Sequence, residues 1–187
     1  TIVTLKYELP DGTQLNKKAV VYKHGVPKIT MTYLNGKTID GTTVKAVGSA
    51  YTSGEWSNGV KVRIDFNTED VQDVINQVTM KTVQYYDVNT KNWTTICSNN
   101  NKDYCIWEVN TNFNKTLKFR ITNSNGHNSD VTGEYTIKVD KTTPTCGTLS
   151  QNNSWTNVPK TVSVGCNDTG GSTCNRATYS VTYPQSG

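Results

Sequence analysis

Five cysteines are the residues of this chain with the clearest capacity for covalent chemistry. They are Cys97, Cys105, Cys146, Cys166 and Cys174. The first two enclose the polar stretch SNNNKDY, and the last two enclose the equally long stretch NDTGGST. Each pair flanks a turn between two predicted strands, a geometry that can bring two Cα atoms within disulfide range. The spacing therefore predicts two local disulfides, each of which stabilises the fold by on the order of 2–3 kcal/mol.

Other uses of these cysteines fit the spacing less well. A zinc site usually has two to four residues between paired ligands and often a nearby histidine, and a redox motif has the form C-x-x-C. His24 and His127 do not lie beside either pair. Cys146 is left over, and we expect it to be unpaired or bonded to another molecule. A rival pairing of Cys146 with Cys166 stays open, because both residues fall on neighbouring predicted strands.

Acidic and histidine residues offer little support for an enzyme. A Ser/His/Asp arrangement needs a histidine next to a nucleophile, and both histidines fall in a turn or at a strand end. Glu69, Asp70 and Asp73 form an acidic cluster that is a weak calcium candidate. Glycoside hydrolysis would need two carboxylates across a cleft. We therefore expect no catalytic activity and no cofactor.

Two further residue types have possible binding roles. Trp93 and Trp107 could form a platform on which a sugar stacks, although the alternation around them predicts that at least one fills the core. Asn92, Asn114, Asn152 and Asn167 each begin an N-x-[ST] triplet, the glycosylation acceptor pattern. Such triplets also arise by chance in a chain this rich in Asn and Thr.

The composition predicts an all-β protein with a thin core. Only 34% of the residues are hydrophobic, Thr favours strands, and Asn favours turns. The net charge of +4 comes from the first 47 residues, where seven Lys face three acids. These lysines are spread over several strands without Arg clusters, which disfavours nucleic-acid binding. No apolar run is long enough to insert in a membrane. Several cysteines in a polar chain favour an oxidising, extracellular location.

The strand pattern predicts three segments. SGEWSNGVKVRIDF (53–66) and NNSWTNVPKTVSVGCND (152–168) share a Trp, a hydroxyl residue, an Asn and an alternating strand, about 100 residues apart, which favours tandem domains. Residues 48–141 show turn signals about every 8–12 residues, as in a complete β-sandwich. Pro144 marks a stiff linker. Residues 1–47 form a β-rich segment, and 142–187 begin a second, partial unit.

The junction carries a family resemblance. YTIKVDKTTPTC, followed by WTN, VSVGC, NDTGGSTC and YSVTY, resembles the tandem bacterial Ig-like repeats of cell-surface and secreted proteins, over roughly residues 45–187. NSNGHNS (123–129) replaces the family's Asp-x-Ala-Gly-Asn turn. The resemblance implies Ig-like sandwich units in tandem on a bacterial cell surface. Because similar repeats often carry a further cysteine near their last strand, it also implies that the partner of Cys146 lies beyond Gly187.

We therefore predict a non-enzymatic extracellular module that is structural or adhesive, such as a stalk or a pilus-like filament subunit. The orphan segment 1–47 and the partial unit 142–187 could complete each other between neighbouring copies by strand complementation. The expected partners are copies of the chain or further Ig-like repeats. The alternative is an accessory module that recognises a surface glycan or a host protein.

Overall fold

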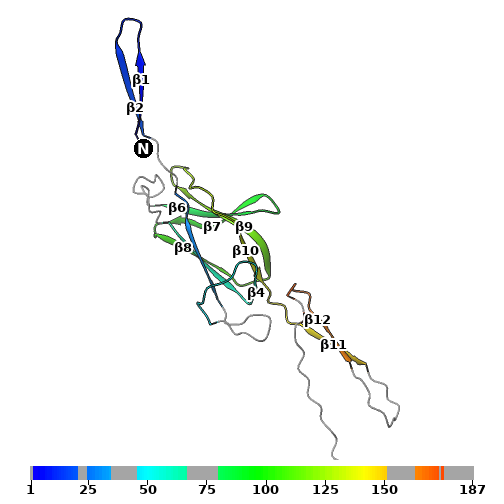
Figure 1. Cartoon of the computed structure of the whole chain (residues 1–187). Coiled ribbons are helices and arrows are strands. Elements are labelled where there is room, and N and C mark those ends of the chain that lie inside the picture. Colours follow the sequence, from blue (N-terminus) through cyan, green and yellow to red (C-terminus); the bar gives the residue numbers. More distant parts are fainter. Residues whose placement is uncertain are drawn as a thin grey trace, which may run out of the picture. The chain divides into compact units, whose positions relative to one another are not determined.

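The computed structural model describes residues 2–20, 25–34, 46–66, 80–150, 163–172 and 174, and these form β-strands and loops with no helix (Figure 1). The strands are β1 (Ile2–Glu8), β2 (Gln14–Val20), β3 (Lys28–Tyr33), β4 (Trp56–Ser57), β5 (Val60–Asp65), β6 (Lys81–Asp87), β7 (Asn92–Asn100), β8 (Tyr104–Val109), β9 (Phe113–Asn123), β10 (Tyr135–Val139), β11 (Thr145–Ser150) and β12 (Ser163–Asn167). The predicted all-β class is confirmed. The described part of the chain holds no helix that could span a membrane.

The strands form four sheets. The larger two have the orders β4-β10-β9-β6-β7 and β3-β5-β8, and the smaller two are the hairpins β1-β2 and β11-β12. Each of the larger sheets has a buried apolar face, as the sheets of a β-sandwich do. The alternation read from GVKVRIDF is confirmed, because Val60, Val62, Ile64 and Phe66 are at most 1% exposed.

The sheet that contains β3 extends across the predicted segment boundary. Lys28–Tyr33 belongs to the sheet that also contains β5 and β8, and Met31 and Tyr33 are buried. The boundary expected between residues 47 and 48 therefore does not coincide with the sheets. The long polar stretch between β3 and the next described strand hid this relation, because strand pairing across a loop leaves no local signal in the sequence.

The contacts divide the chain into two compact units, Thr1–Thr30 with Val62–Trp107 and Lys115–Thr136, and Met31–Lys61 with Glu108–Asn114 and Ile137–Gly187. In the first unit, β6 and β9 pair antiparallel with Val83 opposite Ile121 and Tyr85 opposite Phe119. All four side chains are buried. This cross-strand set fixes the register, because a slip of one residue would turn every apolar side chain to the other face.

The second unit is held by a pair of tyrosines. The rings of Tyr33 and Tyr51 meet edge to face with centroids 5.3 Å apart. The Tyr33 hydroxyl donates to a Glu55 carboxylate oxygen at 2.5 Å. The Tyr51 hydroxyl donates to the Glu55 carbonyl at 2.5 Å and accepts from the Lys138 amide at 3.1 Å. Burial, followed by the hydrogen bond to Glu55, raises the pKa of Tyr33.

Tyr33→Phe is expected to lower the free energy of unfolding by about 1–3 kcal/mol, because it removes a hydrogen bond to a charged group. Urea unfolding followed by fluorescence measures this value. Tyr86→Phe is the control, since the Tyr86 ring is half-buried against Trp93 and its loss of a hydroxyl should change stability by less than about 0.5 kcal/mol. Equal effects of the two changes would contradict the role given to the Tyr33 hydroxyl.

Candidate functional site

The β1-β2 hairpin has one apolar face and one polar face. Its strands pair over seven residue pairs, with Val3 opposite Ala19, Leu5 opposite Lys17 and Tyr7 opposite Leu15. Side chains alternate between the faces of a strand, so the odd-numbered residues share one face. That face carries four exposed apolar side chains: Val3 (40% exposed), Leu5 (62%), Tyr7 (64%) and Leu15 (53%). We call these four side chains the hairpin face.

Exposed apolar side chains on a two-stranded hairpin are stabilised when another surface packs against them. An isolated two-stranded hairpin is marginally stable in water, and a packed face or further strands are needed to hold it. Exposed contiguous apolar patches mark interaction sites on soluble proteins. The opposite face of the same hairpin is polar in its middle, with Thr4 opposite Lys18 and Lys6 opposite Asn16, while Ile2 is opposite Val20 at one end. The two faces of the hairpin therefore differ in polarity.

The β11-β12 hairpin is the second small sheet with an exposed surface. Cys146 lies directly opposite Cys166, and Leu149 opposite Val164, with an irregularity in register between these two pairs. Every described side chain of β12 is exposed, and Val164 is 40% exposed. The sequence predicted a half-buried strand here. The alternation that predicted burial is present, but nothing in the described part of the chain covers it.

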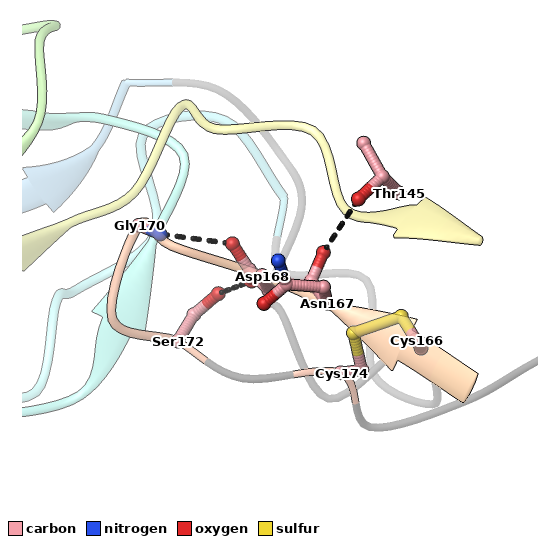
Figure 2. The surroundings of a disulfide bond; sticks show 7 residues. All are labelled: Thr145, Cys166, Asn167, Asp168, Gly170, Ser172 and Cys174. Carbon is pink, nitrogen blue, oxygen red and sulfur yellow. Dashed lines mark hydrogen bonds between the residues drawn. A yellow bond between two sulfur atoms is a disulfide. The ribbon is translucent and has the colours of Figure 1, made fainter. Parts of the chain in front are cut away.

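A disulfide closes the loop that follows β12 (Figure 2). Cys166 and Cys174 are bonded, with Cα atoms 6.0 Å apart. Inside the loop, Asp168 accepts hydrogen bonds from the Gly170 amide at 3.0 Å and the Ser172 hydroxyl at 2.9 Å. The Thr145 hydroxyl donates to the Asn167 carbonyl at 3.3 Å. The loop is thus tied both to itself and to β11.

The same loop docks against Asp140 and Trp56. The Asp140 carboxylate accepts from the Ser172 amide at 3.0 Å and from the Thr142 amide at 2.8 Å. A Cβ at Gly170 would overlap this carboxylate, and a Cβ at Gly171 would lie 2.8 Å from the Trp56 ring. Gly171 also has a φ of 103°, a backbone conformation that residues with a side chain rarely adopt. We call this contact the glycine dock, and it requires both glycines.

The dock depends on the charge of Asp140, which is 5% exposed. Burial raises the pKa of Asp140, but the hydrogen bonds from Ser172 and Thr142 outweigh burial and hold the pKa below its ordinary value of 3.8. When the pKa of a carboxyl group is lower in the folded state than in the unfolded state, the group stabilises the fold at any pH above its unfolded-state pKa. This contribution is lost as the pH falls through the folded-state pKa.

We therefore expect the dock to persist at neutral pH and to weaken only below about pH 3.8. The amide shifts of Thr142 and Ser172, which both donate to Asp140, are followed by NMR as the pH is lowered and measure the transition. Asp140→Asn keeps a hydrogen-bond acceptor and removes the charge, so its shifts should not titrate in this range. A wild-type transition centred above pH 5 would contradict the role given to Asp140.

The other predicted disulfide is also present. Cys97 and Cys105 are bonded, with Cα atoms 6.4 Å apart, and Cys105 is buried. Cys146 is free and exposed. Within the described residues, no three His, Cys, Asp or Glu side chains lie together as metal ligands, and the oxygens of Asp140 and Asp168 already accept hydrogen bonds from the protein.

The two predicted binding tryptophans do not share a surface. Trp107 stacks on Tyr85 with ring centroids 5.2 Å apart, and Trp93 lies 5.2 Å from Tyr86. Tyr85 and Tyr86 are neighbours on β6 and therefore point to opposite faces. The Arg120 guanidinium also lies 3.8 Å from the centroid of Trp93. A joint platform of Trp93 and Trp107 is not formed, and Trp93 is already engaged in a cation–π contact.

The remaining predicted residues are scattered. Asn92, Asn114 and Asn167 are exposed positions on β7, β9 and β12, and His127 is exposed in the turn after β9. The acidic cluster Glu69, Asp70 and Asp73 lies outside the described residues, as do His24 and Asn152. The sequence reading missed the glycine dock, although the pair Gly170-Gly171 in a loop closed by cysteines was a signal of close approach.

Comparison with known proteins adds no relative to this picture. No protein-family model matches the chain, and neither a curated protein nor a solved structure shows a significant match. Four features of the described residues therefore bear on function: the exposed hairpin face, the β11-β12 hairpin, the two disulfides and the glycine dock.

Proposed function

We propose that this chain is a non-enzymatic structural or adhesive module outside the cell, built from tandem Ig-like units of the kind found on bacterial surfaces. The two local disulfides support an oxidising compartment. The buried apolar residues of the two larger sheets support a β-sandwich scaffold. The glycine dock supports a fixed link between Asp140, just after β10, and the loop that the Cys166–Cys174 disulfide closes.

One observation carries the assembly part of the proposal. The described residues include two small hairpins, of which β1-β2 leaves four apolar side chains exposed and β11-β12 leaves Val164 exposed. The face with Val164 and Cys166 is uncharged, and the hairpin face carries one opposing Lys17 among apolar residues. Two such faces can form the two layers of a small sandwich.

The occupant we assign to the hairpin face is the β11-β12 hairpin of a second copy. Different surfaces of the same chain then meet, so the contact is heterologous, and a heterologous contact that does not close into a ring produces a filament. Strand complementation along the outer edges of the two hairpins would add main-chain hydrogen bonds to this contact. The chain becomes a pilus-like or stalk-forming subunit.

Sedimentation velocity over a concentration series, with electron microscopy of the same samples, tests this assembly. We expect a series of species that grows with concentration, and rods or fibres on the grid. A single closed dimer would point to an isologous contact and overturn the head-to-tail arrangement. A monomer at every concentration would overturn assembly by these faces altogether.

A second candidate function is recognition of a glycan or a host protein. The outer face of β6, β7 and β9 favours it, because Tyr86, Trp93, Arg120 and Gln84 gather there, with Arg120 donating to Gln84 at 3.0 Å. Binding on a glycan array that Trp93→Ala abolishes without unfolding the chain would support this function. Trp107→Ala is the matched control, since Trp107 packs against the buried Tyr85.

A further inference from the structure

The three cysteines around β11 and β12 form a cluster whose thiol chemistry plays no part in the assembly proposal. Cys166 is bonded to Cys174, and the free, exposed Cys146 lies directly opposite Cys166 in the antiparallel ladder. Residues directly opposite each other project to the same face of a sheet. One disulfide sulfur therefore has a free thiol as its cross-strand neighbour.

The spacing permits a bond between the two strands. Opposed residues of an antiparallel pair have Cα atoms about 4.5–5.5 Å apart, and disulfides span Cα separations of about 4.4–6.8 Å. The existing Cys166–Cys174 separation of 6.0 Å falls in the same range. Cys166 is thus within bonding reach of two partners, one on the neighbouring strand and one at the end of its own loop.

We propose that the protein exists as two disulfide isomers that interconvert by internal thiol–disulfide exchange. The Cys146 thiolate attacks the sulfur of Cys166 and forms the Cys146–Cys166 bond, while the electron pair of the old bond leaves on the Cys174 sulfur. The proton that Cys146 loses is matched by the proton that Cys174 gains. The exchange is redox-neutral, because one disulfide and one thiol are present before and after it.

The glycine dock biases this equilibrium. The Cys166–Cys174 bond closes a ring that contains Asp168, Gly170 and Ser172 (Figure 2). The same ring contains Gly171, which forms the dock together with Gly170 and Ser172. Exchange opens this ring and ties β11 to β12 instead. Because the closed ring limits the conformations of the loop, it favours docking, and by linkage docking favours the closed ring. The pair of isomers is a switch between a docked loop and a stapled hairpin.

The tryptic sites of the chain separate the isomers cleanly. Cleavage after Lys141, Lys160 and Arg176 places Cys146 on one peptide and both Cys166 and Cys174 on the next. In the closed-ring isomer the two peptides are not linked, whereas in the exchanged isomer a disulfide joins them. The protein is incubated at pH 8, quenched with acid, alkylated and digested with trypsin. Mass spectrometry without reduction then gives the ratio of joined to separate peptides.

We expect joined peptides, and a free thiol on Cys174, in the wild-type protein. Gly171→Ala weakens the dock and should raise the ratio at least about fivefold, which corresponds to about 1 kcal/mol. Cys146→Ser should abolish the joined peptide. Alkylation confined to Cys146 in both wild type and Gly171→Ala would overturn the proposal.

A second variant tests the geometry without the competing partner. Cys174→Ser leaves Cys146 and Cys166 alone, and in a glutathione redox buffer they should form a disulfide within one molecule. A mixture of isotopically light and heavy protein distinguishes this from a bond between copies. Two persistent thiols, or joined peptides that combine light and heavy chains, would overturn the assignment. The inference is independent of the filament proposal, because each of these readings concerns a single molecule.

Discussion

Leu5→Lys is expected to weaken association between copies by about 10- to 100-fold. Leu5 is 62% exposed at the middle of the hairpin face, and burying a Leu side chain contributes about 1.5–3 kcal/mol. Each 1.4 kcal/mol is about tenfold in an association constant. Lysine also brings a charge that must lose water when the face is covered. Sedimentation velocity over a concentration series measures the change.

The control for this variant lies one residue away. Thr4→Lys adds the same charge on the polar face of the same strand, and the new lysine faces Lys18 just as the one at position 5 would face Lys17. Net charge and cross-strand repulsion are therefore matched, and only the face differs. Equal weakening by both variants would show that charge, and not the hairpin face, governs association.

Gly171→Ala is expected to open the glycine dock, with hydrogen exchange at the Ser172 amide faster by on the order of 30- to 100-fold. A non-glycine residue in the left-handed region costs about 1–2 kcal/mol, and the added Cβ would lie 2.8 Å from the Trp56 ring. Because the Ser172 amide donates to Asp140 only in the docked loop, its exchange reports the open fraction.

Gly165→Ala is the matched control for the dock. Gly165 lies on the same hairpin, in β12, and a Cβ there would meet nothing within 4 Å. Exchange at Ser172 should stay within about twofold of wild type, since surface changes away from special backbone positions have small effects. If hydrogen exchange at the Ser172 amide is unchanged in Gly171→Ala, the close contact between Gly171 and Trp56 is not required for docking of the loop.

Local patterns predicted the local structure well. The alternation in GVKVRIDF identified a buried strand face, and the spacing of Cys97 with Cys105 and of Cys166 with Cys174 identified both disulfides. Each of these features is encoded within about ten neighbouring residues. A period of two fixes which side chains share a face, and a short polar loop between strands brings its ends together.

Relations between distant segments were not predictable in this way. Lys28–Tyr33 joins a sheet with β5 and β8, and Trp56 meets Gly171 from more than 100 residues away. The alternation of Val164 and Cys166 predicted burial, yet both residues are exposed, because alternation reports which residues can be covered and does not supply the cover. Alternation around Trp93 and Trp107 predicted that at least one of them fills the core, and Trp107 stacks on the buried Tyr85.

The most direct test of the assembly is to identify what covers the hairpin face. A photoreactive benzoylphenylalanine at Tyr7, in a mixture of isotopically light and heavy protein, marks the surface that lies on this face. We predict cross-linked peptides that join position 7 of one copy to residues 145–150 or 163–167 of another. Cross-links confined to a single copy, or joining position 7 to residues 2–20 of another copy, would contradict the head-to-tail arrangement.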